Sequence, residues 1–427
     1  MTVLPWLFPA LAGFACIGIP ALAWARRGRM YAIFTGVALG ISMPGLLVSY
    51  FRLDAWLATG PPVVRGALEV AFAYAMVALL LHMASMVRAR LRSFPVRILV
   101  NGPGQTFLAA GTLAGAWLLL LLPVRLGLLA VDAQGALDAL RGFDLVPFVL
   151  AIFFAITSPR LRRETVDIAL GGDGPEAVTR VAVQRHRGPE GPRPGVLRIA
   201  QVTDPHLGPW QSIGSLQKTL DGLLARDPDL VLLTGDYLTM EGNGTPGALA
   251  KALRPLKNAP GRCFAIFGNH DHEAPEEVRS ALESNDVPLL IDAEATVETP
   301  SGSVQILGSD YVRKERAAHL EGLCQRFPRR ADHLRLLLLH DPQGFDSVPE
   351  GEADLVLSGH THGGQVGLVS LGLDWTFLTR SRWPDHGLFA KGRNRLYVHR
   401  GTGFYGFPLR MGVPGEASIL EIDRAQA

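Results

Sequence analysis

The sequence predicts an α/β domain of two packed β-sheets flanked by helices, preceded by an all-helical transmembrane region. Up to about Ile156 the chain is dominated by apolar runs, whereas the remainder has the alternating, charged pattern of a soluble domain. In that second part strands first alternate with amphipathic helices and then follow one another closely. This change of pattern is typical of two sheets packed together with helices outside.

We divide the 427 residues into a transmembrane region of four to five helices (1–158), a linker with a possible edge strand (159–195) and the soluble domain (196–427). The net charge is only +2, and no basic patch is interleaved with aromatic residues, so we expect no nucleic-acid partner. The three cysteines lack metal-site spacing and cannot all pair. We therefore expect no disulfide framework and reducing surroundings for the soluble domain.

Four apolar stretches are long enough to cross a bilayer, which takes about 20 helical residues. They are 2–24, 31–51, 64–87 and roughly 107–124. The first is no convincing signal peptide, because its arginines follow the apolar run instead of preceding it. Buried helices of a large soluble protein are the alternative, but four such runs so close together are unusual there. We expect the lipid bilayer to be a partner of this region.

A fifth stretch, 145–156, has a length that suits an interfacial helix as well as a short span. Arginines cluster after the first, third and fifth stretches, and the positive-inside rule assigns all three clusters to the cytoplasm. If the fifth stretch spans, every cluster lies on one side and the soluble domain is cytoplasmic. If it lies in the interface, the soluble domain is outside. We expect the first arrangement, with the clusters at Arg26, Arg27 and Arg29, at Arg88, Arg90, Arg92 and Arg97, and at Arg160, Arg162 and Arg163.

Few ionisable side chains lie within the spans. Glu69 and His82 are the only acidic or histidine residues in the first three, and both lie nearer to an end than to the middle. Arg125, just past the fourth run, is expected to reach the headgroups. The region therefore has the character of an anchor and not of an ion path.

The linker contains turn signals at 171–175 and 188–192, with an alternating, strand-like segment at 177–185 between them. In the soluble domain, the apolar patterns predict strands and helices in succession. The strands are expected at 196–202, 230–234, 262–267, 287–291, 296–299, 304–307, 334–339, 355–358, 395–399 and 417–422, and the helices at about 213–226, 248–256, 275–284 and 316–326.

Five of these strands end at residues suited to binding a cation. Alone, each motif is also ordinary turn chemistry, and a single histidine is more often a hydrogen-bonded core residue. Together they predict one metal site, because the carboxyl ends of strands in α/β sheets gather at one edge. Oxygen and imidazole ligands without thiolate suit Mn, Fe or Zn. The motifs are Asp204-Pro205-His206, Gly235-Asp236, Gly268-Asn269-His270-Asp271, His340-Asp341 and Gly359-His360-Thr361-His362.

This series resembles the signature of the calcineurin-like metallophosphoesterases, over about half of the chain, from Val196 to Asp423. Gly363-Gly364-Gln365, together with 397–403 and 408–410, is similar to the bacterial membrane-associated branch of that family. Pro205 departs from that branch, which usually carries leucine or isoleucine there. The resemblance implies two packed mixed β-sheets flanked by helices, and an integral protein of the bacterial inner membrane.

The resemblance also implies a site for two divalent metal ions that share a bridging carboxylate, as two-metal phosphoesterases do. One ion would be held by Asp204, His206 and His362, the other by Asn269, His340 and His360, with Asp236 as the bridge.

Two further residues would carry catalysis. His270 would stabilise the phosphate and protonate the leaving oxygen, and Asp271 would orient His270. His272 is expected to be solvated surface.

We therefore expect a membrane-anchored phosphoesterase in which a metal-activated hydroxide attacks a phosphodiester, phosphomonoester or pyrophosphate bond. Similar enzymes hydrolyse the pyrophosphate of UDP-2,3-diacylglucosamine in lipid A biosynthesis on the cytoplasmic face, so a lipid-linked substrate suits the expected topology. A phosphodiesterase acting on a soluble substrate is the alternative. A non-catalytic membrane sensor that retains the fold is another alternative. Loss of a metal ligand or of His270 would favour a sensor, but all of these residues are present.

Overall fold

The computed structural model describes residues 4–186 and 193–423, so the turn expected at 188–192 lies outside the described residues. The chain forms two compact units. The helical unit comprises Met1–Thr157 and Gly406–Leu409, and the C-terminal unit comprises Ser158–Tyr405 and Arg410–Ala427.

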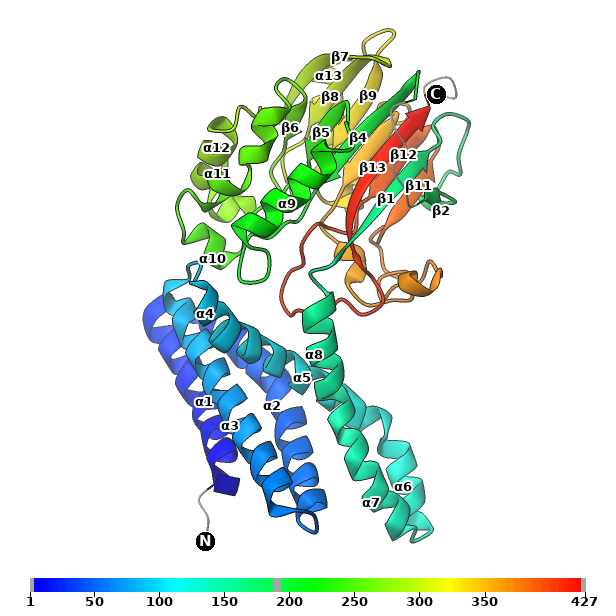
Figure 1. Ribbon diagram of the computed structural model, residues 1–427. Helices are drawn as coiled ribbons and strands as arrows, with labels where there is room; N and C mark the ends of the chain where they lie inside the picture. Colours follow the sequence, from blue (N-terminus) through cyan, green and yellow to red (C-terminus); the bar gives the residue numbers. More distant parts are fainter. Residues whose placement is uncertain (1–3, 187–192, 424–427) are drawn as a thin grey trace. The chain divides into compact units, whose positions relative to one another are not determined.

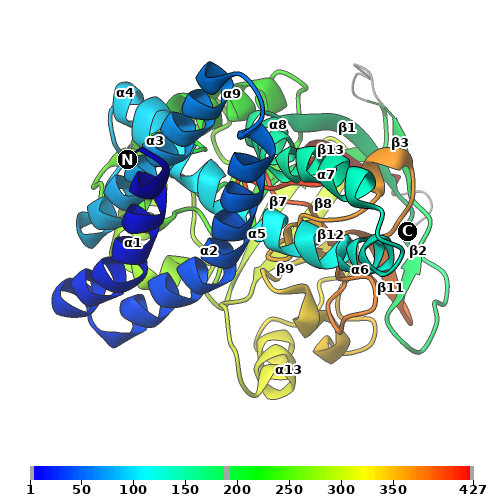
Figure 2. The same cartoon turned by 90° about the horizontal axis from the view of Figure 1, so that it is seen from below.

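Long helices that pack side by side make up most of the helical unit, as Figures 1 and 2 show from two directions. The longer ones are α1 (Leu4–Arg27), α2 (Arg29–Leu57), α3 (Pro62–Ser85), α5 (Gly102–Leu120) and α8 (Val146–Thr157), with the shorter α4 (Phe94–Val96), α6 (Leu122–Ala130) and α7 (Gln134–Gly142). Close approach of α2 and α5 depends on glycine, because a Cβ on Gly45 would lie 2.2 Å from the carbonyl oxygen of Gly111.

Within the described residues, four helical segments are long and apolar enough to cross a membrane: Pro5–Arg27, Arg29–Leu57, Pro62–Arg88 and Gln134–Thr157. A fifth is possible if Phe94–Leu120 and Leu122–Ala130, which meet at a bend of 42°, form one span. The stretch at 145–156 thus belongs to a full-length apolar segment, and the stretch at 107–124 belongs to the bent pair.

A buried ion cluster in the helical unit is centred on Asp144. The carboxylate of Asp144 is fully buried and accepts hydrogen bonds from Arg125 at 2.5 Å and from Arg52 at 2.6 Å. Arg125 is itself buried. The expectation that Arg125 extends to the headgroups was wrong, because Asp144 provides an acidic partner inside the unit.

Two mixed sheets form the C-terminal unit, as the sequence predicts. The first sheet has the order β3-β1-β13-β4-β5-β6 and the second β2-β11-β12-β10-β9-β8-β7. In the first, β4, β5 and β6 run parallel; in the second, β8, β9, β10 and β12 do. The first sheet consists of β1 (Leu161–Ile168), β3 (Gln184–His186), β4 (Val196–Val202), β5 (Leu230–Leu233), β6 (Cys263–Ala265) and β13 (Gly415–Asp423). The second consists of β2 (Thr179–Val181), β7 (Ala293–Thr299), β8 (Gly302–Gly308), β9 (Leu334–Leu338), β10 (Leu355–Ser358), β11 (Gly387–Lys391) and β12 (Asn394–Val398).

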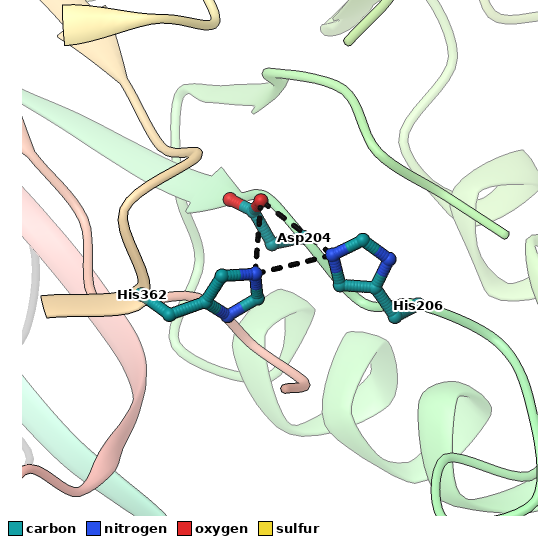
Figure 3. A group of neighbouring side chains, drawn as sticks. All are labelled: Asp204, His206 and His362. Carbon is teal, nitrogen blue, oxygen red and sulfur yellow. Dashed lines mark hydrogen bonds and ion pairs between the residues drawn. The ribbon is translucent and has the colours of Figure 1, made fainter. Parts of the chain in front are cut away.

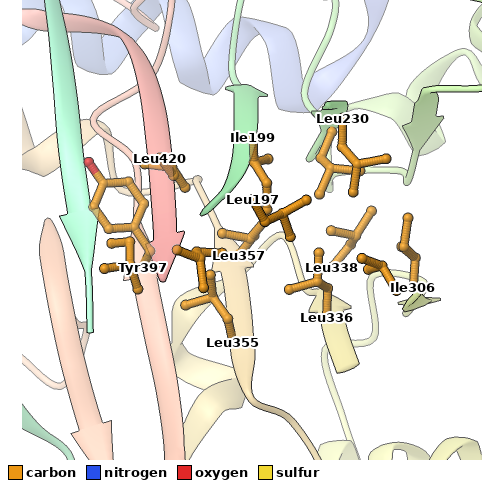
Figure 4. Close-up of a cluster of buried hydrophobic side chains, with 14 of the residues drawn as sticks. Leu197, Ile199, Leu230, Ile306, Leu336, Leu338, Leu355, Leu357, Tyr397 and Leu420 are labelled. Carbon is orange, nitrogen blue, oxygen red and sulfur yellow. The ribbon is translucent and has the colours of Figure 1, made fainter. Parts of the chain in front are cut away.

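The apolar core lies between the two sheets (Figure 4). Alternate residues of each strand point into it, such as Leu197 and Ile199 of β4, which meet Leu336, Leu355 and Leu357 of the second sheet. Fully burying one such leucine stabilises a fold by about 1.5–3 kcal/mol. The described part of the unit also contains the α-helices α9 (Ile213–Leu224), α11 (Ala248–Ala252), α12 (Pro275–Glu283) and α13 (Arg316–Arg326), and the shorter α10 (Met240–Asn243).

The segment 159–195 contributes to both sheets. The sequence predicts one edge strand at 177–185, and the structure has two short edge strands there, β2 in one sheet and β3 in the other. It also contains β1, which pairs in parallel with β13 over eight residues and which the sequence analysis did not predict. The strand expected at 287–291 is absent from the described residues; only a bridge between Ala265 and Leu289 remains.

Candidate metal centre

The polar motifs that follow β4, β5, β6, β9 and β10 meet at one edge of the C-terminal unit, because these strands run parallel within their sheets. Several of these residues have a left-handed backbone, which is costly for a residue with a Cβ and is concentrated at functional sites. The φ angles are 51° at Asp204, 45° at His206, 58° at Asp236, 68° at His360 and 51° at His362.

The first group consists of Asp204, His206 and His362, all buried (Figure 3). The two imidazoles face each other, with 3.1 Å between their Nε2 atoms. Oδ1 of Asp204 lies 3.4 Å from Nε2 of His362 and 3.8 Å from Nε2 of His206. Three ligand atoms thus converge on one point.

The second group consists of Asp236, His340 and His360. Oδ2 of Asp236 lies 3.3 Å from Nε2 of His340, and the same oxygen lies 3.9 Å from Nε2 of His206 in the first group. Asp236 therefore faces both groups. Asn269 follows β6, and its Oδ1 is buried without a hydrogen-bond partner among the described residues.

Surrounding groups occupy one atom of Asp204 and one of His340 and leave the other atom facing the centre. Oδ2 of Asp204 accepts hydrogen bonds from the Thr203 hydroxyl at 2.7 Å and from the His360 backbone at 2.9 Å. Nδ1 of His340 donates to the carbonyl of Thr234 at 2.7 Å, so Nε2 is the atom that faces Asp236. Neither Oδ1 of Asp204 nor Nε2 of His340 has a hydrogen-bond partner among the residues that the structure describes.

The protonation of the histidines suits cation binding. Burial lowers the pKa of His206 and of His360 to about 4 and that of His362 well below its ordinary value, so each ring is neutral at pH 7 and offers a lone pair. Burial also acts on His340, but Asp236 raises its pKa to about 10. Without a metal, Nε2 of His340 would therefore carry a proton that faces Asp236. Buried, unpartnered oxygen and nitrogen atoms fit divalent ions with mixed N and O ligands.

Contrary to expectation, the carboxylate of Asp271 does not contact His270. The carboxylate of Asp271 accepts backbone hydrogen bonds from Asp236 and Gly268 at 2.7 Å and from Tyr237 at 2.9 Å. Its neighbours are backbone N–H groups because two strand-end loops converge on it. Nδ1 of His270 instead contacts Oε1 of Glu273 at 2.8 Å. The prediction that Asp271 orients His270 was therefore wrong, and Glu273 is in that position.

His270 lies at the rim of the centre, with its side chain 23% exposed. Burial lowers its pKa, but Glu273 and Asp236 raise it by more, and the net shift is upward. His272 lies further out, 40% exposed, and contacts Asp310 at 3.0 Å.

Sequence analysis missed Tyr405. Its ring stacks on His270 with 4.6 Å between centroids and lies 5.0 Å from the ring of His206. Burial raises the pKa of Tyr405 to about 12, so its hydroxyl is protonated at neutral pH. The only signal in the sequence is an aromatic pair between Gly403 and Gly406, just after the segment 397–403.

Two glycines allow the strand-end loops to approach one another. A Cβ on Gly268 would lie 2.2 Å from Oδ1 of Asp236, and a Cβ on Gly359 would lie 2.2 Å from Oδ2 of Asp204. The segment 397–403 holds the first loop from the other side, since the backbone N–H of Gly403 donates to the carbonyl of Asp204 at 2.9 Å. Pro205 leaves both neighbouring side chains in the site.

An open cleft of about 870 Å³ adjoins the second group at His360. Its lining combines the aromatic rings of Tyr311 and Trp383 with three arginines and three acidic residues: Arg313, Arg316, Arg382, Glu315, Asp341 and Asp346. Arg316 is paired with Asp341, whereas the guanidinium of Arg382 lies 4.6 Å from the centre of the Trp383 ring. The cleft therefore offers room for a substrate that is larger than a phosphate, and Arg382 and Trp383 form a cation–aromatic pair on its wall.

A third group of possible ligands, Asp167, His186 and Glu421, lies apart from this centre. Arg193 contacts both of its carboxylates, and Arg198 contacts Glu421 at 3.2 Å. These arginines neutralise the acids, so this group is an ion-pair cluster.

Comparison with known proteins gives a consistent result. The model of the family described as calcineurin-like phosphoesterase matches residues 197–364. The chain is 31% identical over 238 residues to the uncharacterized metallophosphoesterase YkoQ of Bacillus subtilis, covering 53% of this chain and 83% of that protein. It is 29% identical over 233 residues to phosphodiesterase YaeI of Escherichia coli, covering 53% of this chain and 82% of that protein.

A third relative extends the similarity beyond the C-terminal domain. The transmembrane protein with metallophosphoesterase domain from Bos taurus is 26% identical over 311 residues, covering 69% of this chain and 66% of that protein. This share is larger than the part of the chain from Val196 onward, so the match includes residues before β4. Together with the apolar helices, it indicates a membrane protein.

Proposed function

Since the chain belongs to the calcineurin-like phosphoesterase family, we propose that it is a membrane-anchored hydrolase that cleaves a phosphoester or pyrophosphate bond with the help of two divalent metal ions, Mn, Fe or Zn. The observation that carries this proposal is the position of Asp236, whose Oδ2 faces both His340 and His206. Asp236 is assigned as the bridge. The other ligands form two sets, Asp204, His206 and His362 for one ion and Asn269, His340 and His360 for the other.

Two bound ions would activate water as the nucleophile and offset the charge of the phosphate. The ligand set contains only two carboxylates, Asp204 and Asp236, so the loaded site retains positive charge that attracts an anionic substrate. Neutral imidazoles and the amide of Asn269 add no charge.

His270 is assigned as the general acid. Its raised pKa favours the protonated ring, and contact of Nδ1 with Glu273 leaves Nε2 to donate a proton to the leaving oxygen. The protonated hydroxyl of Tyr405, stacked on His270, is available to donate a hydrogen bond to the phosphate.

The substrate is proposed to be lipid-linked, such as UDP-2,3-diacylglucosamine. The membrane anchor supports this, because it confines the catalytic unit to the bilayer surface. The cleft beside His360 also supports it, since its volume exceeds that of a phosphate and the rings of Tyr311 and Trp383 could stack on the planar ring of a nucleotide. The protein is proposed to lie in a bacterial inner membrane with the catalytic unit in the cytoplasm, where the three arginine clusters belong if the bent helix pair is one span.

The test is hydrolysis of bis-p-nitrophenyl phosphate and of UDP-2,3-diacylglucosamine by the full-length protein in detergent, with and without Mn²⁺. We expect metal-dependent turnover that Asp236→Asn abolishes. Asp286→Asn is the matched control, because Asp286 is exposed and has the same φ of 58° as Asp236.

The aryl diester tests whether the protein is a catalyst, and the lipid tests whether its substrate is lipid-linked. Turnover of the aryl diester without turnover of the lipid would favour a soluble phosphodiester. A folded, metal-loaded protein that is inactive on every phosphoester would contradict catalysis and favour a sensor.

A further inference from the structure

Exposed large hydrophobic side chains are concentrated in one segment of the C-terminal unit. Six are exposed among its described residues, and five of these lie between Leu368 and Phe377, with Leu371 and Phe377 each 75% exposed. The same segment has one acidic residue, Asp374, and is followed by Arg380 and Arg382. An apolar surface of this kind on a soluble domain marks an interaction site. The five are Leu368, Leu371, Leu373, Trp375 and Phe377.

These side chains project from an ordered backbone. Leu368 donates a backbone hydrogen bond to Trp375, and Phe377 donates one to Val366, both at 2.8 Å. We call the segment 366–377 the apolar hairpin. Its Thr376 is buried and donates to the Asp385 carboxylate, while the Asp385 carbonyl accepts from Thr361, which lies between His360 and His362. The hairpin is therefore fixed to the metal centre.

The base of the apolar hairpin lies beside the entry point of the chain into this unit. Gly367 donates a backbone hydrogen bond to Met411 at 2.8 Å, and the backbone N–H of the preceding Arg410 donates to the hydroxyl of Ser158 at 2.8 Å. Ser158 directly follows α8, the end of the last apolar segment.

Strand register places the metal centre at the same end. β1 begins at Leu161, which pairs with Gly415 at the start of β13. Because β13 runs antiparallel to β4, the start of β13 lies at the end of β4, which leads to Asp204. Figure 1 shows the start of β1 and the orange segment that contains the apolar hairpin at one end of this unit.

We propose that the apolar hairpin is a second membrane contact, which inserts Leu371, Leu373, Trp375 and Phe377 into the lipid–water interface. A bilayer is the occupant because the membrane segment ends at Thr157, and only three residues separate it from β1, a reach of at most about 14 Å for an extended chain. Leucine, tryptophan and phenylalanine on a structured turn, with arginines beside them, are the composition of an interfacial anchor.

The contact has a consequence for the substrate, which rests on the proposed function. A hairpin fixed through Asp385 to Thr361 holds the metal centre close to the headgroup layer. The scissile phosphate of an amphiphilic substrate could then reach the centre while its acyl chains remain in the bilayer.

The experiment uses full-length protein in vesicles of phosphatidylethanolamine and phosphatidylglycerol, with nitroxide-labelled lipid as quencher. The exposed Cys16 is replaced by serine, and an environment-sensitive fluorophore is attached to Leu371→Cys or Phe377→Cys. Arg393→Cys is the matched control, since Arg393 is exposed and precedes β12 at the end of the sheet away from the metal centre.

At positions 371 and 377 we expect a blue shift of the fluorophore emission and quenching of most of that emission by the nitroxide-labelled lipid. At position 393 we expect neither change. Quenching at neither hairpin position would overturn the proposal, and so would equal quenching at 393. A blue shift without quenching would also overturn it, because the hairpin would then be covered by protein. The readout does not require activity, so it is separate from the test of catalysis.

Discussion

The backbone N–H of Asp236 donates a hydrogen bond of 2.7 Å to the carboxylate of Asp271, which also accepts from Gly268 and Tyr237. The proposed bridging ligand is thus held by its own main chain. Replacing Asp271 with alanine leaves three buried N–H groups without acceptors, at about 1–3 kcal/mol for each unsatisfied group.

We therefore expect Asp271→Ala to lower the thermal unfolding midpoint and to weaken metal binding. A variant that unfolds like the wild type but has an altered pH profile would instead indicate a role through His270. Glu283→Ala is a suitable control, because Glu283 is an exposed residue at the end of α12.

His270 and Glu273 form the second testable pair. Loss of a general acid reduces turnover by about 10²–10⁴-fold when the leaving group needs a proton. We expect His270→Ala to show this loss with an alkyl phosphodiester and a smaller loss with p-nitrophenyl esters, whose leaving group is a stable anion. Glu273→Ala should give an intermediate loss. The control is His333→Ala, since His333 lies before β9, at the opposite end from His340. Equal losses on both substrates would argue against proton transfer.

The strands that deliver the ligands could be predicted because their signals are local. Apolar runs followed by polar residues identify β4, β5, β9 and β10, and β10 spans the residues predicted, Leu355–Ser358. Whether the motifs meet depends on parallel pairing, which their order in the chain favours.

The features that sequence analysis did not predict, β1 and the contacts of Asp271, depend on residues far away in the chain. β1 reads as Leu-Arg-Arg-Glu-Thr-Val-Asp-Ile, and its Glu164 is buried only because Arg185 and Arg400 pair with it. No local apolar pattern predicts such a strand. The contacts of Asp271 were missed for a related reason, since they are made to backbone atoms and not to side chains.

Metal content should follow the bridging role of Asp236. We expect two Mn²⁺ ions per chain in the wild type and fewer in Asp236→Asn, measured by elemental analysis after dialysis. Ligand binding at 100 times Kd stabilises a fold by about 2.7 kcal/mol, so Mn²⁺ should raise the unfolding midpoint of the wild type and chelation should lower it. Full occupancy in Asp236→Asn, equal to that of Asp286→Asn, would show that the bridge is not needed.

The helical unit should be sensitive to Asp144. Removing one partner of a buried ion cluster costs about 3–5 kcal/mol, because the remaining charges stay buried. Asp144→Asn should therefore lower the unfolding midpoint in detergent, measured by tryptophan fluorescence. Asp138→Asn is the control, since Asp138 is 60% exposed and its pair with Arg141 at 3.2 Å contributes little. Similar midpoints for both variants would mean that Arg52 and Arg125 find other partners.

The side of the membrane on which the catalytic unit lies follows from the bent helix pair. If Phe94–Leu120 and Leu122–Ala130 form one span, the arginine clusters and the C-terminal unit share the cytoplasmic side, and Gly60, between α2 and α3, lies outside. In a chain with Cys16→Ser, a membrane-impermeant maleimide should then label Gly60→Cys in intact cells and Arg393→Cys only after permeabilisation. Labelling of both in intact cells would mean that the bent pair re-enters without crossing. The catalytic unit would then be outside, where a substrate made in the cytoplasm could not reach it.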